Sequence, residues 1–229
     1  MKKLFTAIMR LGPWPLRAPA SSALPDPSTT QVALGVAGLL VGLMTAVLYL
    51  LASMLLPSRI ALLISLCVGL AASLPRATSG LPQPALTGPS GLAMALMLLI
   101  KLETVSEIDH AWSAIILICS TTWARCAVVA ARADPISGLG PASNGSRAAC
   151  LLIGTAPMLF FGLLPEPAWG LWMAALAVLL ISRLLRGIGW TAPLAVRWAL
   201  AETVYCVVVV LLMSAAALAE FTEEDSEDS

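Results

Sequence analysis

The chain has 229 residues, of which 59% are hydrophobic and only 11% are charged, and its acidic and basic residues balance to zero net charge. Soluble domains have about 45–50% apolar and about 25% charged residues, so this composition excludes an ordinary water-soluble domain. A mean hydropathy of +0.91 instead fits helices whose apolar side chains face lipid and whose backbone groups bond internally. The expected partner is therefore the lipid bilayer, and no nucleic-acid partner is expected.

The apolar segments predict an all-α fold, a polytopic transmembrane helix bundle of about seven helices, with six as the alternative. The length leaves room for six to eight spans of roughly 20 residues and for no second domain. The predicted spans cover 32–56, 60–74, 91–108, 111–131, 148–164, 168–182 and 196–219. Two of them, 60–74 and 168–182, are shorter than the roughly 17–25 residues of a full crossing. Each of these two is either re-entrant or extends into its flanks.

The two ends of the chain differ from the apolar middle. Residues 1–31 form a predicted interfacial arm with a short amphipathic piece at 4–11. Five prolines separate its basic start from the first apolar run, which does not fit a cleaved signal peptide. The transmembrane helical domain is predicted at 32–219. The acidic run at 220–229 has almost no apolar content and is predicted to be a disordered tail.

Basic residues are unevenly distributed over the predicted loops. If the N-terminus is cytoplasmic and seven spans cross, one side holds four basic residues of the N-terminal arm and Arg76, Arg132, Arg147, Arg183, Arg186 and Arg197, and the other side holds only Arg59. Short cytoplasmic loops carry the excess of Lys and Arg. We therefore expect a bacterial cytoplasmic (inner) membrane protein with its N-terminus inside and its C-terminus outside. If one of the two short spans did not cross the membrane, the C-terminus would lie on the cytoplasmic side instead.

Ionisable residues inside predicted spans are candidates for function, because each costs about 2.5–3.5 kcal/mol on insertion scales. Lys101 and Arg125 are two such residues, and Glu202 is the only acid of the last span. Glu202 is the predicted partner of Lys101 or Arg125, and contact with a substrate is the alternative for Lys101. Glu107 and His110 have the spacing of some metal ligands, but we interpret them as an interfacial patch and predict no metal ligand.

Small and aromatic residues in the spans are interpreted as packing features. Five cysteines lie in apolar runs without a C-x-x-C pair, so they are expected to be small buried hydrophobes. Gly35, Gly38 and Gly42 are spaced for close helix contact. Tryptophans near predicted span ends are expected at the membrane interface; they are Trp112, Trp169, Trp172, Trp190 and Trp198.

Three segments rich in Gly, Pro and Ser would share the cytoplasmic side: PRATSGLPQPALTGPSG, DPISGLGPASNGS and RLLRGIGWTAPLAVR. Together with the opening MKKLFTAIMRLGPWPLRAP and the first span, they resemble, in order, the adenosylcobinamide-GDP ribazoletransferases, or cobalamin synthases. Arg183 and Arg186 could hold a phosphate by bidentate contacts, although anchoring to lipid headgroups explains them equally well. The substrate-binding candidates are Gly88, Gly91, Lys101, Gly138, Gly140, Arg183, Arg186, Thr191 and Glu202.

The resemblance implies transfer of the cobinamide phosphate from adenosylcobinamide-GDP to alpha-ribazole, with release of GMP and with magnesium at the transferred group. The family carries an H-x-D-G-x-x-D-x-x-D-G motif between its second and third spans, whereas this chain has no carboxylate from Ile60 through Leu102. A divalent cation needs several oxygen ligands. We therefore expect a divergent member with reduced or lost activity, for which catalytic residues are unknown and magnesium is a cofactor only if it is active.

Three functions stay open on the sequence. One is a transferase whose carboxylates come from a partner. The second is a non-catalytic scaffold or binding protein for a corrinoid intermediate or for corrinoid-pathway enzymes. The third is a small transporter subunit, for which the ionisable residues inside the spans are the only support.

Overall fold

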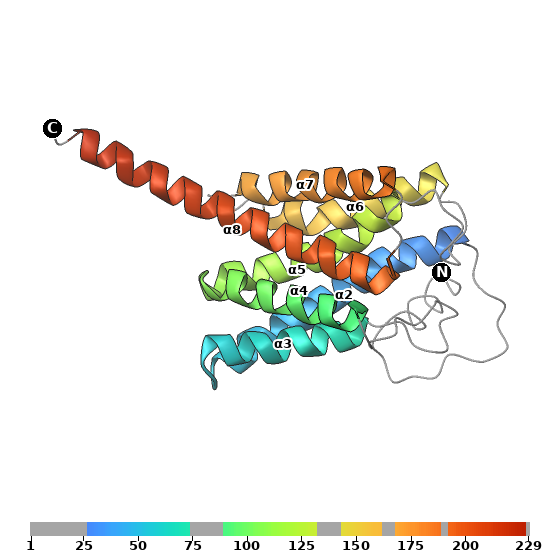
Figure 1. Ribbon diagram of the computed structural model, residues 1–229, viewed down its shortest axis with the longest axis horizontal. Helices are drawn as coiled ribbons and strands as arrows, with labels where there is room; N and C mark the ends of the chain where they lie inside the picture. The colour runs from blue at the N-terminus through green and yellow to red at the C-terminus, as the bar shows by residue number, and fades with distance from the viewer. Residues whose placement is uncertain (1–26, 74–88, 132–142, 162–167, 189–191, 228–229) are drawn as a thin grey trace.

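The computed structural model describes residues 27–73, 89–131, 143–161, 168–188 and 192–227. All regular structure in these ranges is helical, which confirms the predicted all-α bundle (Figure 1). The seven described helices are α2 (Pro27–Ser53), α3 (Ser58–Ser73), α4 (Pro89–Ser106), α5 (His110–Ala131), α6 (Asn144–Phe161), α7 (Ala168–Gly187) and α8 (Leu194–Glu227). The predicted amphipathic piece at 4–11 lies outside the described residues, and 27–31 belong to α2 rather than to a separate arm.

Successive helices run in alternating directions along the long axis of the bundle (Figure 1). At one end, α2, α4, α6 and α8 begin and α3, α5 and α7 end; we call it the loop end, on the right in Figure 1. The opposite end, the hairpin end, holds the short connections at 54–57 and 107–109. The helix ends that flank the three glycine-bearing segments therefore meet at the loop end, as the predicted alternation of spans requires.

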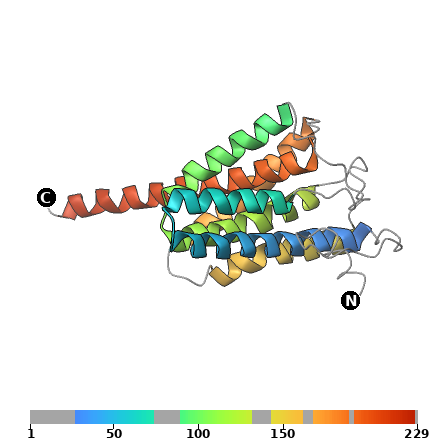
Figure 2. The same cartoon turned by 90° about the horizontal axis from the view of Figure 1, so that it is seen from below.

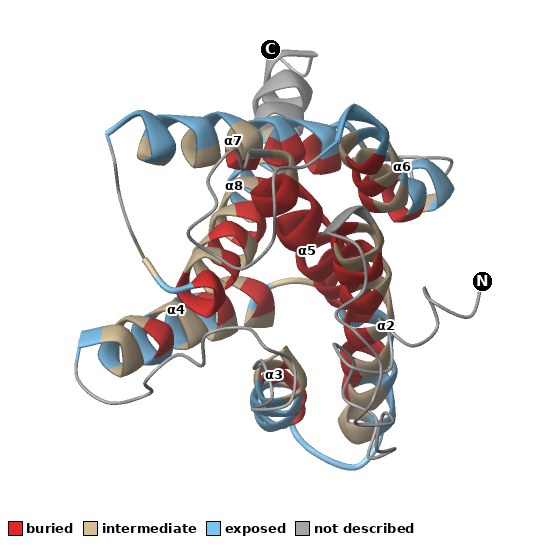
Figure 3. Ribbon diagram, turned by 90° about the vertical axis from the view of Figure 1, so that its right-hand side faces the viewer, coloured by how far each residue is buried: buried red, intermediate tan, exposed pale blue. Residues whose placement is uncertain are grey.

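Helix α5 forms the centre of the bundle (Figure 3). It contacts α2, α6, α7 and α8, and residues on all its sides are buried, among them Ile116, Leu117 and Cys126. Glycines bring α2 close to it. A Cβ at Gly42 would lie 3.1 Å from the Cα of Ile118, so a side chain at this position would force the backbone of α5 to move away. The predicted close contact of the α2 glycines is confirmed.

Helices α3 and α4 lie on the side of α5 away from α6 (Figure 3). Helix α3 packs chiefly on α2, and α4 packs chiefly on α8, while α3 and α4 contact each other less. On α3, Gly69 faces the side chain of Thr45, whose Oγ1 would lie 2.6 Å from a Cβ at that position. The helices α2, α3, α4, α5 and α8 thus surround a space in the bundle interior.

In the part of the chain that the structure describes, five helices are long and apolar enough to cross a membrane: α2, α4, α5, α7 and α8. Of the two alternatives for the short predicted span 168–182, the structure shows extension into its flank, because α7 continues to Gly187. Helix α3 has 16 residues, or about 24 Å at 1.5 Å per residue, against a hydrocarbon core of about 30 Å. Helix α6 contains Pro157 and begins with polar residues around Arg147.

Helix α8 is longer than its predicted span. Its 34 residues correspond to about 51 Å, and its C-terminal part projects beyond the bundle at the hairpin end (Figure 2). The sequence predicted disorder from residue 220, but the helix continues to Glu227. Extending a formed helix adds one hydrogen bond per residue without a new nucleus, and Glu is a good helix former. The prediction of disorder rested on the repulsion between the acidic side chains, and these two effects offset that repulsion.

Four of the five cysteines are buried, and Cys67 is exposed on α3, so burial is confirmed for all but one of them. The tryptophans that were expected at the membrane interface also differ in exposure. Trp169 and Trp172 are half-exposed near the start of α7, where interfacial rings are expected. Trp198 was expected at the interface too, but it is only 4% exposed, because Arg125 and neighbouring helices cover its ring.

Candidate functional site

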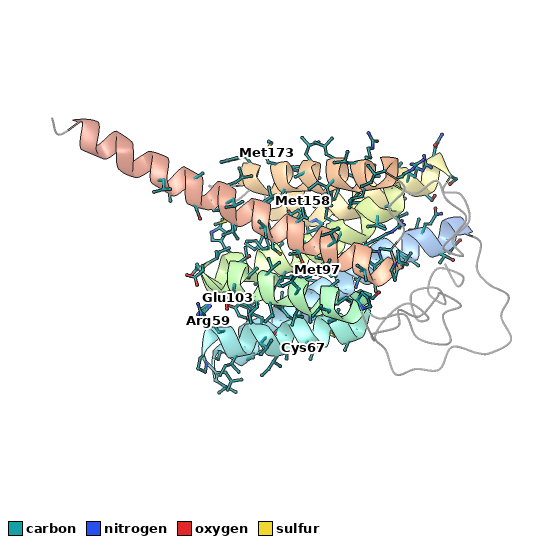
Figure 4. All side chains as sticks on the ribbon, in the orientation of Figure 1. Arg59, Cys67, Met97, Glu103, Met158 and Met173 are labelled. Atoms are coloured by element: carbon teal, nitrogen blue, oxygen red, sulfur yellow. The ribbon has the colours of Figure 1, made fainter. Side chains whose placement is uncertain are left out.

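A pocket with a cavity of about 50 Å³, partly open to the outside of the bundle, lies between α2, α3, α4, α5 and α8. Its wall is mixed. Leucine and methionine side chains, including Met97, alternate with charged and hydroxyl groups, including Lys101, Glu202 and Thr203. Figure 4 labels Met97 on the middle part of α4. Helices that pack through apolar side chains do not require polar groups inside the bundle. The polar groups of this pocket therefore mark it as a candidate functional site.

The pocket holds a buried ion pair. Lys101 of α4 donates from Nζ to Oε2 of Glu202 on α8 at 2.8 Å. The side chains are 7% and 16% exposed, respectively. The predicted partnership of Glu202 with Lys101 is therefore present in the structure. A buried charge without a partner is strongly destabilising, so each of these two side chains fixes the position of the other and of its helix.

Arg125 of α5 is a second buried cation, 2% exposed. It donates to the carbonyl oxygen of Ala37 at 3.2 Å and to Oγ of Ser73 at 2.6 Å. Its guanidinium carbon lies 5.4 Å from the ring centroid of Trp198, within the range of a cation–π contact. Gly38 on α2 makes room for this side chain, because a Cβ there would lie 3.2 Å from Cδ of Arg125.

The charges around the pocket do not balance. Lys101 and Arg125 interact electrostatically with each other and with Glu202. Among the described residues, Glu202 is the acid that both cations share, and the direct partners of Arg125 are neutral oxygens and an aromatic ring. The described part of the site thus carries one net positive charge in the bundle interior. Such a site favours an anion.

Three of the hydroxyl groups that line the pocket donate to backbone carbonyls. Thr45 donates to Val41, and Thr203 donates to Ala199, each at 2.8 Å. Ser73 donates to Gly69 at 2.6 Å. Because these three protons are used within the helices, Lys101, the charged donor that lines the pocket, is better placed than these hydroxyls to contact a bound anion.

The other predicted site residues are less closely grouped. Gly91 lies in the first turn of α4, partly buried, while Arg183 and Arg186 are exposed near the end of α7. None of these three lines the pocket, although all belong to helix turns at the loop end. The remaining candidates lie outside the described residues: Gly88, Gly138, Gly140 and Thr191.

A separate polar cluster lies at the hairpin end. Arg59 bridges Glu107 at 3.0 Å and Glu103 at 3.6 Å, with all three side chains largely exposed; Figure 4 labels Arg59 and Glu103 close together there. His110 is exposed, and its Nδ1 is 2.7 Å from the hydroxyl of Tyr49. Glu107 and His110 therefore have different partners, which fits the interpretation as an interfacial patch.

The pocket does not fit the magnesium ion that the family resemblance implies. Hard divalent cations take several oxygen ligands, usually with carboxylates among them. Glu202 is the one carboxylate lining the pocket, and it is bound to Lys101. Within the described ranges, no group of three His, Cys, Asp or Glu side chains is placed to hold a metal. The described residues of the pocket therefore offer a magnesium ion too few oxygen ligands.

Sequence reasoning identified Lys101, Glu202 and Arg125 as buried ionisable residues but missed their surroundings. Trp198 and Ser73 were not expected to contact Arg125. Both lie near helix ends at the loop end, where tryptophan and serine are common for unrelated reasons, so their sequence positions carried no signal. Their role follows only from the packing of α3 and α8 against α5.

Comparison of the chain with models of protein families, with curated proteins and with solved structures finds no match. The resemblance to the cobalamin synthases therefore stays a prediction from the order and spacing of segments in the sequence.

Proposed function

We propose that this chain is a cobalamin-synthase-like membrane protein that binds a phosphate-bearing corrinoid intermediate at the loop end, with phosphate transfer lost or strongly reduced. In this proposal the glycine-bearing segments hold the ligand, and the charged pocket beneath them attracts its negative charge. The protein acts as a binding protein or scaffold in corrinoid assembly.

The observation that carries the proposal is the Lys101–Glu202 pair. These are the two ionisable residues that the resemblance selects, one after the G-x-x-G segment and one after the segment containing Thr191. They are 101 positions apart in the chain and yet lie 2.8 Å from each other. The resemblance and the packing of the helices thus point to the same place in the bundle, which supports treating the segments as parts of one site.

The distribution of arginines supports a cytoplasmic loop end. Arg147, Arg183, Arg186 and Arg197 belong to helix turns at the loop end, whereas Arg59 is the only basic residue among the described residues near the hairpin end. Lys and Arg are enriched in cytoplasmic loops. We propose the inner membrane of a bacterium, with the loop end inside and the end of α8 outside. Soluble corrinoid intermediates and pathway enzymes would then meet the loop end directly.

The loss of transfer follows from the chemistry that phosphoryl transfer needs. Such a reaction depends on positioning and on cations that neutralise the developing charge, usually metal ions held by carboxylates. The chain has no carboxylate from Ile60 through Leu102, where the family carries three, and Glu202 is neutralised by Lys101. Binding by Lys and Arg side chains does not need those carboxylates, so binding can persist without transfer.

The test is ligand retention by the purified protein in nanodiscs. Adenosylcobinamide-GDP is coloured, so its co-elution with the protein in gel filtration is followed by visible absorbance. We expect retention by the wild type and a loss of at least about tenfold in affinity, or 1.4 kcal/mol, in the Lys101→Met variant. Arg59→Gln, which removes a cation from the hairpin end, is the matched control and should retain the ligand.

A second measurement separates binding from transfer. Alpha-ribazole and magnesium are added, and GMP release is measured beside an active cobalamin synthase. We expect little or no GMP. Absence of corrinoid retention in the wild type would overturn the proposal, and release of GMP at the rate of the active enzyme would overturn the loss of transfer.

A further inference from the structure

We propose that the pocket between α2, α3, α4, α5 and α8 binds one small anionic group, which compensates the excess positive charge of Lys101 and Arg125. The group is either a free inorganic anion or the anionic group of a larger molecule. This inference goes beyond the corrinoid proposal, because it depends on the charge and size of the pocket alone.

The first argument is the charge. Lys101 and Arg125 are both more than nine-tenths buried, and Glu202 interacts with both of them. One carboxylate cannot neutralise two cations. An unbalanced charge in the interior of a membrane protein is costly and usually marks a functional site. A bound anion of one negative charge would make the site neutral.

The second argument is the supply of hydrogen-bond donors. An ammonium group has three N–H donors, and Nζ of Lys101 makes one hydrogen bond, to Glu202, within the described part of the chain. The buried indole Nε1 of Trp198, another pocket residue, has no hydrogen-bond partner there either. Unsatisfied buried donors are rare in native proteins and point to an additional acceptor. Lys101 lines the cavity, so an acceptor in the cavity can reach it.

The third argument is size and access. A cavity of about 50 Å³ has room for about three to five water molecules, at about 10–15 Å³ each. This space accommodates a halide or the head of one oxoanion. Ser73, at the end of α3, and Ala195, near the start of α8, line the pocket. The pocket thus extends to helix turns at the loop end, from which an anionic group would enter.

An acid outside the described residues is the competing source of the missing charge. Asp26 precedes α2 and Asp134 follows α5 in the sequence, while the segment 74–88 contains no acid. The two explanations differ in their response to anions. A fixed carboxylate makes the stability independent of which anion is present, whereas a bound anion stabilises the fold by mass action.

The experiment uses the full chain in uncharged detergent, with gluconate as the starting anion because gluconate is much larger than the anions tested against it. Chloride, bromide, nitrate or inorganic phosphate then replaces gluconate at constant ionic strength, and the melting temperature is recorded. We expect the wild type to be stabilised with a saturable dependence on at least one small anion. A melting temperature that is the same in all these anions and in gluconate, and that anionic lipid does not raise either, would overturn the proposal. Loss of stability in Asp26→Asn or Asp134→Asn would then identify a fixed acid as the counter-charge.

Two substitutions change the net charge of the site in opposite directions. Lys101→Met brings it to zero, and Glu202→Gln raises it to two. We expect anion affinity to fall by about tenfold in the first and to rise by about tenfold in the second, the factor expected for one charge-assisted hydrogen bond of about 1.4 kcal/mol. The reverse order, or equal affinities, would contradict the proposal, and the wild-type titration decides if one variant does not fold.

The lipid composition of the nanodiscs distinguishes a free anion from the headgroup of an anionic lipid. The titration is repeated in nanodiscs of phosphatidylcholine alone and of phosphatidylcholine with phosphatidylglycerol. Stabilisation by free anions in both identifies a free anion, and stabilisation only by phosphatidylglycerol identifies a lipid headgroup. Failure of corrinoid retention leaves these results unchanged, so the two proposals fail separately.

Discussion

Removal of Glu202 should destabilise the bundle more than removal of Lys101, although the two residues form one ion pair. The Glu202→Gln substitution leaves two buried cations, Lys101 and Arg125, with no described acid beside them. Breaking a buried pair in this way costs about 3–5 kcal/mol. After Lys101→Met, the carboxylate of Glu202 can still interact with Arg125, so we expect a smaller loss of about 1–3 kcal/mol.

The assay is reversible unfolding in mixed micelles with increasing SDS, which gives a free energy of unfolding for each variant. The double variant should lose less than the sum of the single losses, with a coupling of at least about 1 kcal/mol. Arg59→Gln is the control: its side chain is 61% exposed, and exposed ion pairs contribute about 0–1 kcal/mol. A loss for Lys101→Met that exceeds the loss for Glu202→Gln, or losses no larger than the control, would refute the reasoning.

Three further predictions test the packing of the bundle. Gly42→Ala should destabilise by about 1–3 kcal/mol in the same unfolding assay, because a Cβ would press on α5 at 3.1 Å, whereas Gly170→Ala, with its nearest neighbour at 3.9 Å, should be neutral or slightly stabilising. A membrane-permeant maleimide should label one thiol in the native protein, Cys67, and five after denaturation; rapid native labelling of several thiols, counted by mass spectrometry, would contradict the buried positions. Trp123→Phe should cost about 1–3 kcal/mol, because the indole donates to the carbonyl of Ala175 at 2.9 Å, and a neutral result would count against this tie between α5 and α7.

The helices were predictable because their signal is local. Apolar runs bounded by Pro, Gly or charge located all seven helices that the structure describes, with ends displaced by a few residues. The larger displacements of helix ends have physical causes. Helix α7 continues past residue 182 because arginines near a helix end extend along the surface without breaking the helix, and α8 continues past residue 219 because elongation needs no new nucleus.

The site was predictable only in part. Lys101, Arg125 and Glu202 were predicted as site residues only because ionisable residues are rare inside membrane spans. The pairing of Lys101 with Glu202 was one of two options and was decided by the packing of α4 against α8. The contacts of Arg125 with Ser73 and Trp198 depend on three helices meeting, and no local pattern in the sequence encodes such a meeting.

The alternation of seven spans, which brings the arginines and the glycine-bearing segments together at the loop end, is the claim on which the site and its access depend. It is tested most directly by fusing alkaline phosphatase, which folds only outside the cytoplasm, after Ser229 and, in a second fusion, between α7 and α8. We predict an active enzyme on the tail and an inactive enzyme between α7 and α8. An inactive enzyme on the tail, with green fluorescent protein fluorescing at the same position, would contradict the account.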